Sequence, residues 1–300
     1  GARVAPDRED PARATEESAG RRQQTNRWRI VALAVSVVVA LLLGYMFAES
    51  FWIEVKQYEY SSPQVPAEFD GTTIILLADI HRGWLLSQDR VHGLVEKVND
   101  LHPNLIALAG DYVSGSSDNQ ASCFTELAGL KAPLGRFAVL GNHDYGEDPL
   151  PAINAIEQAG IELLDNSGVW IERNGERIRL GGVSDYREGL PELDPAVAGT
   201  VPADLVVLLS HNPDYAETLA GGIVDLMLSG HTHGGQVTFF GLWAPHLPSD
   251  YGQKYRTGMV RNQDTTVIIS NGVGTIFPPM RFFARPQIVE ITLRHAPGTY

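Results

Sequence analysis

The 300-residue sequence is 44% hydrophobic and 8% aromatic, and it carries a formal net charge of −13 at pH 7. This length and apolar content allow one large domain or two small ones with a substantial core. After residue 48 the chain has 16 basic and 31 acidic side chains. A surface of that sign repels nucleic acid, so we expect no nucleic-acid partner. Cys123 is the single cysteine, which excludes intrachain disulfides and thiolate metal clusters and favours a core-filling role.

The N-terminal region has two parts of opposite character. Residues 1–29 contain seven arginines and five acidic residues but almost no large apolar side chains, which predicts a disordered basic tail. Residues 30–48 are nineteen uncharged residues, mostly Val, Leu and Ala, and this length nearly spans a hydrocarbon core as a helix. Arginines precede this stretch, whereas Glu49 and Glu54 follow it. The positive-inside rule therefore predicts a cytoplasmic tail, one transmembrane helix, and an extracytoplasmic remainder of the chain.

Three other interpretations of residues 30–48 stay open. Nineteen residues is long for the apolar region of a cleaved signal peptide, and Tyr45 and Met46 occupy the nearest window for a cleavage site. Arg21-Arg22 resembles the start of a twin-arginine export signal but lacks the apolar context expected after it. A buried core helix would normally show a polar face. An uncleaved membrane anchor remains the favoured interpretation.

The rest of the chain alternates strands and helices early and has hairpins later. We expect a membrane-proximal strand and connector over 49–70, with the strand at 51–60, and one further domain over 71–295. Because of this alternation, the domain is predicted to be an α/β protein with a four-layer αββα sandwich. Its expected helices are 88–101, 120–130, 150–159 and 214–220, its hairpin joins 169–171 to 177–180, and its late strands are 265–270 and 287–294.

Five apolar runs, each typical of a buried strand, end in polar residues able to bind a metal. In an α/β sheet, ligands gather outside the carboxyl ends of the strands, so the five ends together predict a single metal site. The ends are Asp79 and His81 after 74–78, Gly110-Asp111 after 105–109, Gly141-Asn142-His143-Asp144 after 137–140, Ser210-His211 after 205–209, and Gly230-His231-Thr232-His233 after 224–228.

In this order the five ends resemble the motif blocks of the calcineurin-like metallophosphoesterase superfamily, over roughly residues 70–290. The Gly-His-Thr-His-Gly-Gly-Gln run at 230–236, the His-Asn-Pro-Asp block at 211–214 and the N-terminal apolar segment are most similar to its membrane-anchored, YkuE-like branch. The resemblance implies two metal ions. It assigns Asp79, His81, Asp111 and His233 to one ion, and Asp111, Asn142, His211 and His231 to the other.

In that arrangement Asp111 bridges two cations roughly 3.5–4 Å apart, and its negative charge offsets their repulsion. Oxygen and nitrogen ligands without sulfur suit Mn²⁺, Zn²⁺ or Fe. The metal pair would ionise a bridging water, and the resulting hydroxide would attack phosphorus in line. The resemblance further implies that His143 is not a ligand but stabilises the phosphoryl group or protonates the leaving oxygen.

Several residues near the motifs are open to two interpretations. Asp144 either caps a turn or orients His143. Arg82 and Arg281 are expected to be solvated, with phosphate contact as the alternative. Asn271-Gly272 is a weaker hypothesis for the lining of the site. The remaining histidines are expected on the surface or in the core, and they are His92, His102, His246 and His295.

The family resemblance also narrows the class of substrate that we expect. Serine/threonine phosphatases of the superfamily continue their Gly-Asp block with Asp-Arg-Gly, whereas this chain has Ser114-Gly115, so protein phosphatase activity is disfavoured. The segments 83–86 and 276–283 mix aromatic and basic residues, as at membrane interfaces. One hypothesis is that they dip toward the bilayer and present a phospholipid or lipid-linked phosphate ester to the metals. Ordinary packing as core or lid is the alternative.

The sequence therefore predicts a membrane-anchored, two-metal phosphoesterase that hydrolyses phosphate mono- or diesters outside the cytoplasmic membrane. An alternative substrate class is nucleotides or cell-wall phosphodiesters, in which case the anchor only retains the enzyme. A non-catalytic scaffold with the same fold is the least favoured interpretation, because scaffolds of this kind usually lose metal ligands and here all seven are present.

Overall fold

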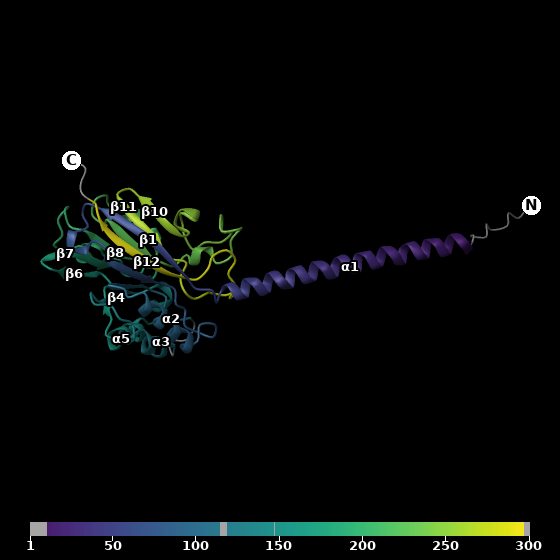
Figure 1. Ribbon diagram of the computed structural model, residues 1–300, viewed down its shortest axis with the longest axis horizontal. Coiled ribbons are helices and arrows are strands. Elements are labelled where there is room, and N and C mark those ends of the chain that lie inside the picture. Colours follow the sequence, from purple (N-terminus) through teal and green to yellow (C-terminus); the bar gives the residue numbers. More distant parts are fainter. Residues whose placement is uncertain (1–10, 115–118, 147, 297–300) are drawn as a thin grey trace, which may run out of the picture. The chain divides into compact units, whose positions relative to one another are not determined.

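The computed structural model describes residues 11–114, 119–146 and 148–296, with side chains from residue 21 onward. The chain forms two compact units, Gly1–Met46 and Phe47–Tyr300. Helix α1 (Pro11–Glu49) makes up the described part of the first unit, and its last three residues belong to the second. Figure 1 shows α1 as one continuous helix.

Within α1, the segment Arg21–Glu49 is long and apolar enough to cross a membrane, with a mean hydropathy of 2.7. The side chains of residues 21–44 are exposed. The helix begins at Pro11, which corrects the predicted disordered tail for residues 11–29, while residues 1–10 lie outside the described residues. Ala, Arg, Glu and Gln are good helix formers. Since the apolar segment already supplies a nucleus, adding turns to it costs little.

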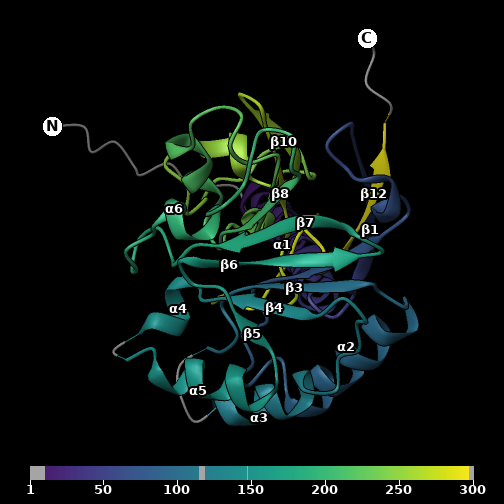
Figure 2. The same cartoon turned by 90° about the vertical axis from the view of Figure 1, so that its left-hand side faces the viewer.

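The second unit contains two six-stranded sheets (Figure 2). The first sheet has the order β1 (Glu54–Ser62), β12 (Gln287–His295), β2 (Thr73–Leu77), β3 (Leu105–Ala109), β4 (Arg136–Val139), β5 (Glu162–Leu163). The second has the order β10 (Gly258–Asn262), β11 (Thr265–Ile269), β9 (Leu226–Ser229), β8 (Val206–Leu209), β7 (Glu176–Gly182), β6 (Ser167–Arg173).

Alternate residues of the central strands enter different cores, which explains why those strands are apolar throughout. In β2, Ile74 and Leu76 pack between the two sheets. Ile75 and Leu77 face the other way. There they meet the helices α2 (Gln88–Asp100), α3 (Asn119–Leu127) and α5 (Leu150–Gln158), which cover the outer face of the first sheet in Figure 2.

The outer face of the second sheet has a thinner cover than the prediction of four layers implies. The short helix α6 (Leu193–Ala196) packs on β6 and β7, and the 3-10 helix Pro213–Thr218 packs on β9 and β11. The expected α-helix over 214–220 is therefore a 3-10 helix, which Pro213 begins where its missing N–H is not needed. The α/β two-sheet sandwich itself is confirmed.

Local signals account for the strand connections. The hairpin of β6 and β7 turns at Asn174 and Gly175, both with positive φ, as the predicted tight turn requires. Strands β2, β3 and β4 run parallel, as do β7, β8 and β9. Their carboxyl ends are aligned, with Leu77 opposite Leu108 in the first sheet and Leu209 opposite Leu228 in the second. The loops that follow these strands therefore meet at one end of the sandwich.

Candidate metal centre

The loops after five strands carry all of the predicted ligands. Six of the seven side chains are buried and Asn142, which begins the short helix α4 (Asn142–Tyr145), is partly buried. Asp79 and His81 follow β2, Asp111 follows β3, Asn142 follows β4, His211 follows β8, and His231 and His233 follow β9.

The first group of ligand atoms surrounds the facing nitrogens of His81 and His233. Their Nε2 atoms lie 3.1 Å apart and their rings are stacked. Asp79 Oδ1 lies 3.4 Å from His233 Nε2, and Asp111 Oδ2 lies 3.6 Å from His81 Nε2. Burial lowers the pKa of His81 to about 4 and holds the pKa of His233 well below its usual value, so both rings are neutral. Neutral imidazoles with converging nitrogens are the form that binds a metal.

The second group surrounds Nε2 of His211. Asp111 Oδ2, Asn142 Oδ1 and His231 Nδ1 each lie 3.2 Å from that nitrogen. The other ring nitrogen, His211 Nδ1, lies 2.7 Å from the carbonyl oxygen of Ala109. A carbonyl only accepts, so Nδ1 carries a hydrogen, and it is Nε2 that would offer a lone pair to the group once its own proton is lost.

Asp111 belongs to both groups through a single oxygen. Its Oδ2 faces His81 and His211, while its Oδ1 accepts a hydrogen bond of 2.8 Å from the backbone N–H of His143. Burial raises the pKa of Asp111, but the neighbouring His211 outweighs this effect and holds it well below its usual value. The carboxylate is therefore ionised, and Oδ2 is the atom placed to be shared.

The electrostatics of the centre favour added positive charge. Burial raises the pKa of Asp79 to about 7, since its ionised form is poorly solvated there. For His211, burial lowers the pKa, yet the Asp111 carboxylate raises it well above the usual value. Several acceptor atoms thus converge in a buried space where either a proton or a metal ion must neutralise them. An oxygen and nitrogen donor set of this kind fits divalent transition metals.

The backbone of the centre is strained, which the sequence did not reveal. Non-glycine residues rarely adopt positive φ, and such strain clusters at functional sites. Here residues in the left-handed conformation contribute side chains to the shared space. The predicted ligands concerned are Asp79 (φ 51°), His81 (46°), Asp111 (58°), His231 (69°) and His233 (52°).

Asp144 supports this backbone. Its carboxylate is buried and accepts hydrogen bonds from the backbone N–H groups of Asp111 (2.6 Å), Tyr112 (2.9 Å) and Gly141 (2.9 Å). Among the described contacts, Asp144 therefore caps the turn rather than orienting His143. A side chain at Gly141 would collide with the backbone nitrogen of Asp111, so the motif glycine is needed for close approach.

Arg281 is neither solvated nor placed to meet phosphate, which corrects both interpretations. Its side chain is fully buried and donates to backbone carbonyls, among them those of His233 (3.3 Å), Asn271 (2.8 Å) and Ala284 (2.7 Å). The side chain of Asn271 accepts from Thr257 Oγ1 and donates to the Arg285 carbonyl, so its amide is engaged in these contacts and does not join the ligand atoms. Arg82 is partly buried and hydrogen-bonds to Asn119.

His143 is the exposed histidine at the rim of the centre. Its ring lies edge-to-face with His81, with 5.0 Å between ring centroids. One of its nitrogens lies within 4.8 Å of ligand atoms of His81 and Asp111, so geometry alone also allows it a ligand role. Other histidines lie elsewhere, as expected. For example, His92 contacts Glu126, and His295 Nδ1 lies 2.6 Å from the Val65 carbonyl oxygen.

A pocket of about 210 Å³ opens beside His81 and His143. Ser114 also lines it, and Ser114 Oγ lies 2.9 Å from His81 Nδ1. The sequence did not predict this contact, which orients the His81 ring. Ser114 occupies the position at which the protein phosphatases described above carry an acidic residue. Gly115 lies outside the described residues. The remaining walls are mostly apolar and come from the two segments singled out above, with Trp84, Leu85, Ile276, Phe277 and Pro279.

Two further features were not predicted. Arg187, after β7, helps to lower the pKa of His231 to about 3, an effect that is due first to burial and then to His211. Its guanidinium lies 3.3 Å from Asp250 Oδ1.

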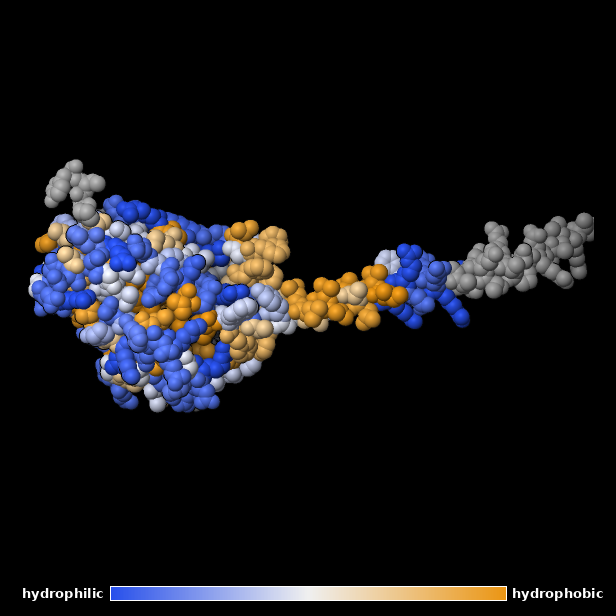
Figure 3. Space-filling view, viewed as in Figure 1, coloured by the Kyte–Doolittle hydropathy of each residue, from blue (hydrophilic) through white to orange (hydrophobic). Residues whose placement is uncertain are grey.

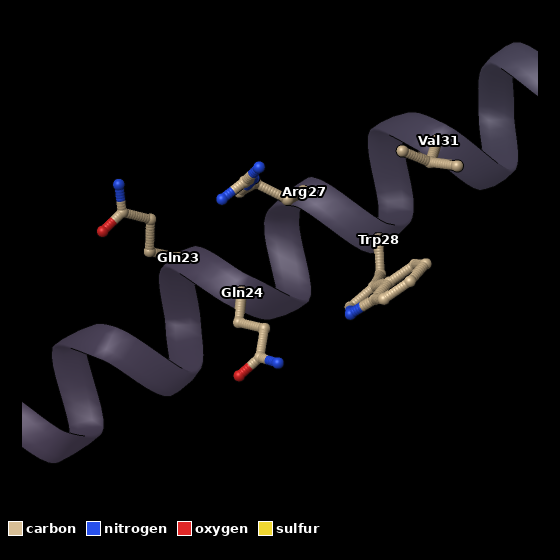
Figure 4. Close-up of a pocket in the computed structure, with 5 residues that line it drawn as sticks. All are labelled: Gln23, Gln24, Arg27, Trp28 and Val31. Carbon is tan, nitrogen blue, oxygen red and sulfur yellow. The ribbon is translucent and has the colours of Figure 1, made fainter.

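A separate hollow on α1 is lined by Gln23, Gln24, Arg27, Trp28 and Val31. Figure 4 shows these side chains fanning out from one helix, and they include no predicted metal ligand, so we assign it no function.

Comparisons with known proteins agree with this geometry. The family model described as calcineurin-like phosphoesterase matches residues 72–235, which include all seven predicted ligands. The chain is 32% identical over 272 residues to an uncharacterized metallophosphoesterase of Aquifex aeolicus, covering 85% of this chain and 98% of that protein. It is 29% identical over 260 residues to the uncharacterized metallophosphoesterase YkuE of Bacillus subtilis, covering 84% and 90%.

Two more distant similarities concern the membrane and the fold. A transmembrane protein with a metallophosphoesterase domain from Danio rerio is 27% identical over 90% of this chain, which spans 63% of that protein. Together with the apolar helix, this similarity suggests a membrane protein. Among solved structures, the NAD nucleotidase of Haemophilus influenzae superposes with a TM-score of 0.46 at 15% identity, covering 67% of this chain and 50% of that one.

Proposed function

Because the chain belongs to the calcineurin-like phosphoesterase family, we propose that it is a two-metal hydrolase of phosphate mono- or diesters. The observation that carries this proposal is the position of Asp111 Oδ2, which faces two separate groups of ligand atoms. One carboxylate oxygen shared in this way is what two neighbouring cations require.

The ligands divide as the family resemblance implies. Asp79, His81 and His233 would hold one ion with Asp111, and Asn142, His211 and His231 would hold the other with Asp111. When bound, two divalent cations activate water for attack on phosphorus and neutralise charge on the phosphoryl oxygens. The protein contributes the rest. The Ala109 carbonyl fixes the tautomer of His211, Ser114 orients His81, and Asp144 holds the strained loop of Asp111 in place.

His143 is placed to act on the leaving group. It is exposed at the rim, and it lines the pocket beside the first ligand group. An imidazole in that position donates a proton to the departing oxygen or a hydrogen bond to the phosphoryl group, and both roles leave the ligand set intact.

The substrate class follows from the walls of the same pocket. Trp84, Ile276 and Phe277 form apolar walls beside His143, and Trp84 and Phe277 are exposed to 78% and 90%. Residues with this exposure are neither core nor a closed lid, so apolar surface remains free to bind a ligand. The substrate we favour is therefore an ester with an apolar group, namely a phospholipid or a lipid-linked phosphate.

The catalytic domain is proposed to lie on the extracytoplasmic side of the membrane. Arginines precede the candidate span Arg21–Glu49 and continue into its first turns, whereas acidic residues follow it. Protease treatment of spheroplasts that express the full chain should degrade residues 50–300. A protected domain would contradict this topology.

The activity itself is tested on the full-length chain in detergent, stripped of metal with a chelator and then reconstituted with Mn²⁺ or Zn²⁺. Bound metal is measured together with hydrolysis of p-nitrophenyl phosphate, its bis ester, a nucleoside monophosphate and a short-chain phosphatidic acid. His231→Ala should lose metal and hydrolysis, and His92→Ala, which changes an exposed histidine outside the centre, should lose neither. A folded chain that binds no metal would refute the proposal, and preference for the nucleotide would refute the lipid substrate.

A further inference from the structure

Exposed apolar side chains gather on the Phe47–Tyr300 unit in a group that we call the aromatic collar. Each member has 45% or more of its surface exposed, and the members are Trp52, Phe239, Phe240, Leu242, Trp243 and Phe283. Figure 3 shows hydrophobic residues gathered at one end of this unit, at the right of the view. Exposed apolar groups on this scale mark interaction surfaces in soluble domains.

The collar is one surface built from separate parts of the chain. The ring of Phe240 lies 4.9 Å from that of Phe239 and 5.4 Å from that of Phe283, centroid to centroid. The two segments are joined by a β-bridge between Val237 and Phe282. Trp52 is linked to them through Arg285, whose guanidinium lies 4.0 Å from the centre of the Trp52 ring.

The exposed rings are held firmly in place. Thr238 Oγ1 donates to the Phe282 carbonyl and accepts from the Gly241 N–H, both at 2.8 Å, and Arg256 donates to the Gly241 carbonyl at 2.7 Å. Phe240 and Phe283 have φ values of 51° and 52°. For bulky residues this conformation is a genuine outlier, and it persists only where the surroundings enforce it. The fold therefore presents these rings to the outside at a cost in backbone strain.

The charge around the collar differs from that of the rest of the unit. Although 31 acidic residues follow residue 48, none lies within 226–249 or 265–289, the stretches that contain five of the six collar residues. The sixth, Trp52, is covered on one face by Arg285. Aromatic rings accompanied by arginine, on stretches that carry no acidic residue of their own, suit the headgroup region of a bilayer.

The chain itself indicates what covers this surface. The candidate span ends at Glu49, whose carboxylate accepts hydrogen bonds of 3.1 Å from the backbone N–H groups of Phe283 and Ala284. Glu49, the last residue of the candidate span, is thus hydrogen-bonded directly to the backbone of the collar. Trp52 of the collar follows it by three residues. We propose that the aromatic collar docks the domain on the surface of the bilayer that Arg21–Glu49 crosses. This docking needs neither bound metal nor turnover.

The test places a nitroxide label on the full-length chain reconstituted in lipid nanodiscs. The buried Cys123 is first replaced by Ala, and Leu242→Cys then provides the label site in the collar. Leu190→Cys is the matched control, because Leu190 is 83% exposed and Leu242 is 78% exposed. We expect the label at 242 to be several-fold less accessible to a water-soluble nickel relaxant than the label at 190, and more accessible to oxygen, which concentrates in lipid.

Three outcomes decide between the possible occupants. Equal nickel accessibility at the two positions would overturn the proposal, because the collar would then face water. Protection of position 242 from both nickel and oxygen would also overturn it, since that pattern indicates a protein contact. If the expected pattern is found, adding Phe239→Asp and Trp243→Asp should restore nickel access at 242. All three readouts are independent of hydrolysis, and unchanged metal content of the labelled chain shows that the fold is intact.

Discussion

Folded proteins usually bury apolar side chains and expose charged ones. The metal centre departs from this pattern because its ionisable side chains are buried, and the aromatic collar departs from it because its apolar side chains are exposed. At the centre, Asp79, Asp111 and His211 are ionisable and buried, whereas at the collar Phe240 and Trp243 are apolar and exposed. Both arrangements cost free energy in an isolated domain, because buried charge lacks solvation and exposed hydrocarbon contacts water. The difference indicates two kinds of partner, a cation for the centre and hydrocarbon for the collar.

The two regions use the same backbone device and share one support. Left-handed φ values occur at His233 in the centre and at Phe283 in the collar, and such strain costs about 1–3 kcal/mol per residue. Between them, the buried guanidinium of Arg281 donates to the carbonyls of His233 and Ala284. Substitutions in the metal centre or in the collar therefore test one region alone, whereas a substitution of Arg281 tests the support that the two regions share.

The largest effect is expected for Asp111→Asn. The substitution keeps the shape of the side chain but removes the charge that both ligand groups share, so both metals should be lost and hydrolysis should fall to background. This loss should exceed the roughly 10–100-fold decrease typical of removing an outer-sphere partner. Elemental analysis beside the hydrolysis assay measures it. Asp79→Asn serves as the comparison and should primarily remove one metal. Full metal content in the Asp111 variant would show that Asp111 does not bridge.

The next effect concerns the rim of the centre. We expect His143→Ala to lower hydrolysis by about 10²–10⁴-fold, the usual range for general acid–base catalysis, with unchanged metal content. The loss should be greater for an alkyl ester than for p-nitrophenyl phosphate, because p-nitrophenolate leaves without a proton. Loss of metal from this variant would instead make His143 a ligand, a role its distance from His81 and Asp111 allows.

The shared support is tested by Arg281→Met. Replacing the guanidinium leaves several buried carbonyls without a donor, at about 1–3 kcal/mol for each unsatisfied group. The free energy of unfolding should therefore fall by about 3 kcal/mol or more, as measured by denaturant unfolding. Arg285→Met is the matched control, because Arg285 is only partly buried and stacks on Trp52. Equal stability of the two variants would show that the carbonyls do not depend on Arg281.

The smallest effect is expected at the pocket that adjoins the centre. Trp84→Ser and Phe277→Ser remove apolar surface that would contact the ester, so KM for a lipid phosphate should rise by roughly 10-fold, in line with 1.5–3 kcal/mol for burying a large apolar side chain. Hydrolysis of p-nitrophenyl phosphate should change much less. Leu190→Ser, an exposed position far along the chain, is the control. Equal losses on both substrates would argue against an apolar binding site.

Local sequence patterns were sufficient to predict most of the fold. The apolar runs before Asp79, Asp111 and His211 are strands β2, β3 and β8, because strands buried on both faces are apolar throughout. The patterns failed where tertiary contacts decide the conformation. Residues 214–220 include a 3-10 helix instead of an α-helix, and β10 was not predicted, since its side chains are largely partly buried or exposed.

The sequence was sufficient to predict which side chains converge at the candidate centre, because parallel strands align their carboxyl ends and bring the residues after them together. The role of Arg281 could not be predicted, and for Asp144 the sequence left turn capping and orientation of His143 equally open. Both act on backbone groups that are distant in sequence, and only the folded chain shows which carbonyls and N–H groups lack partners. The aromatic run at 239–243 was visible in the sequence, but without the fold it was indistinguishable from core.

The sequence by itself thus determined which residues are candidate metal ligands and which segment is apolar enough to cross a membrane, since both properties depend on residue type and short spacing. Only the tertiary structure decided that Asp111 is shared through one oxygen, that Arg281 is buried, and that Phe283 is exposed beside Glu49. These properties depend on distances between segments far apart in the chain, which packing sets and local pattern does not encode.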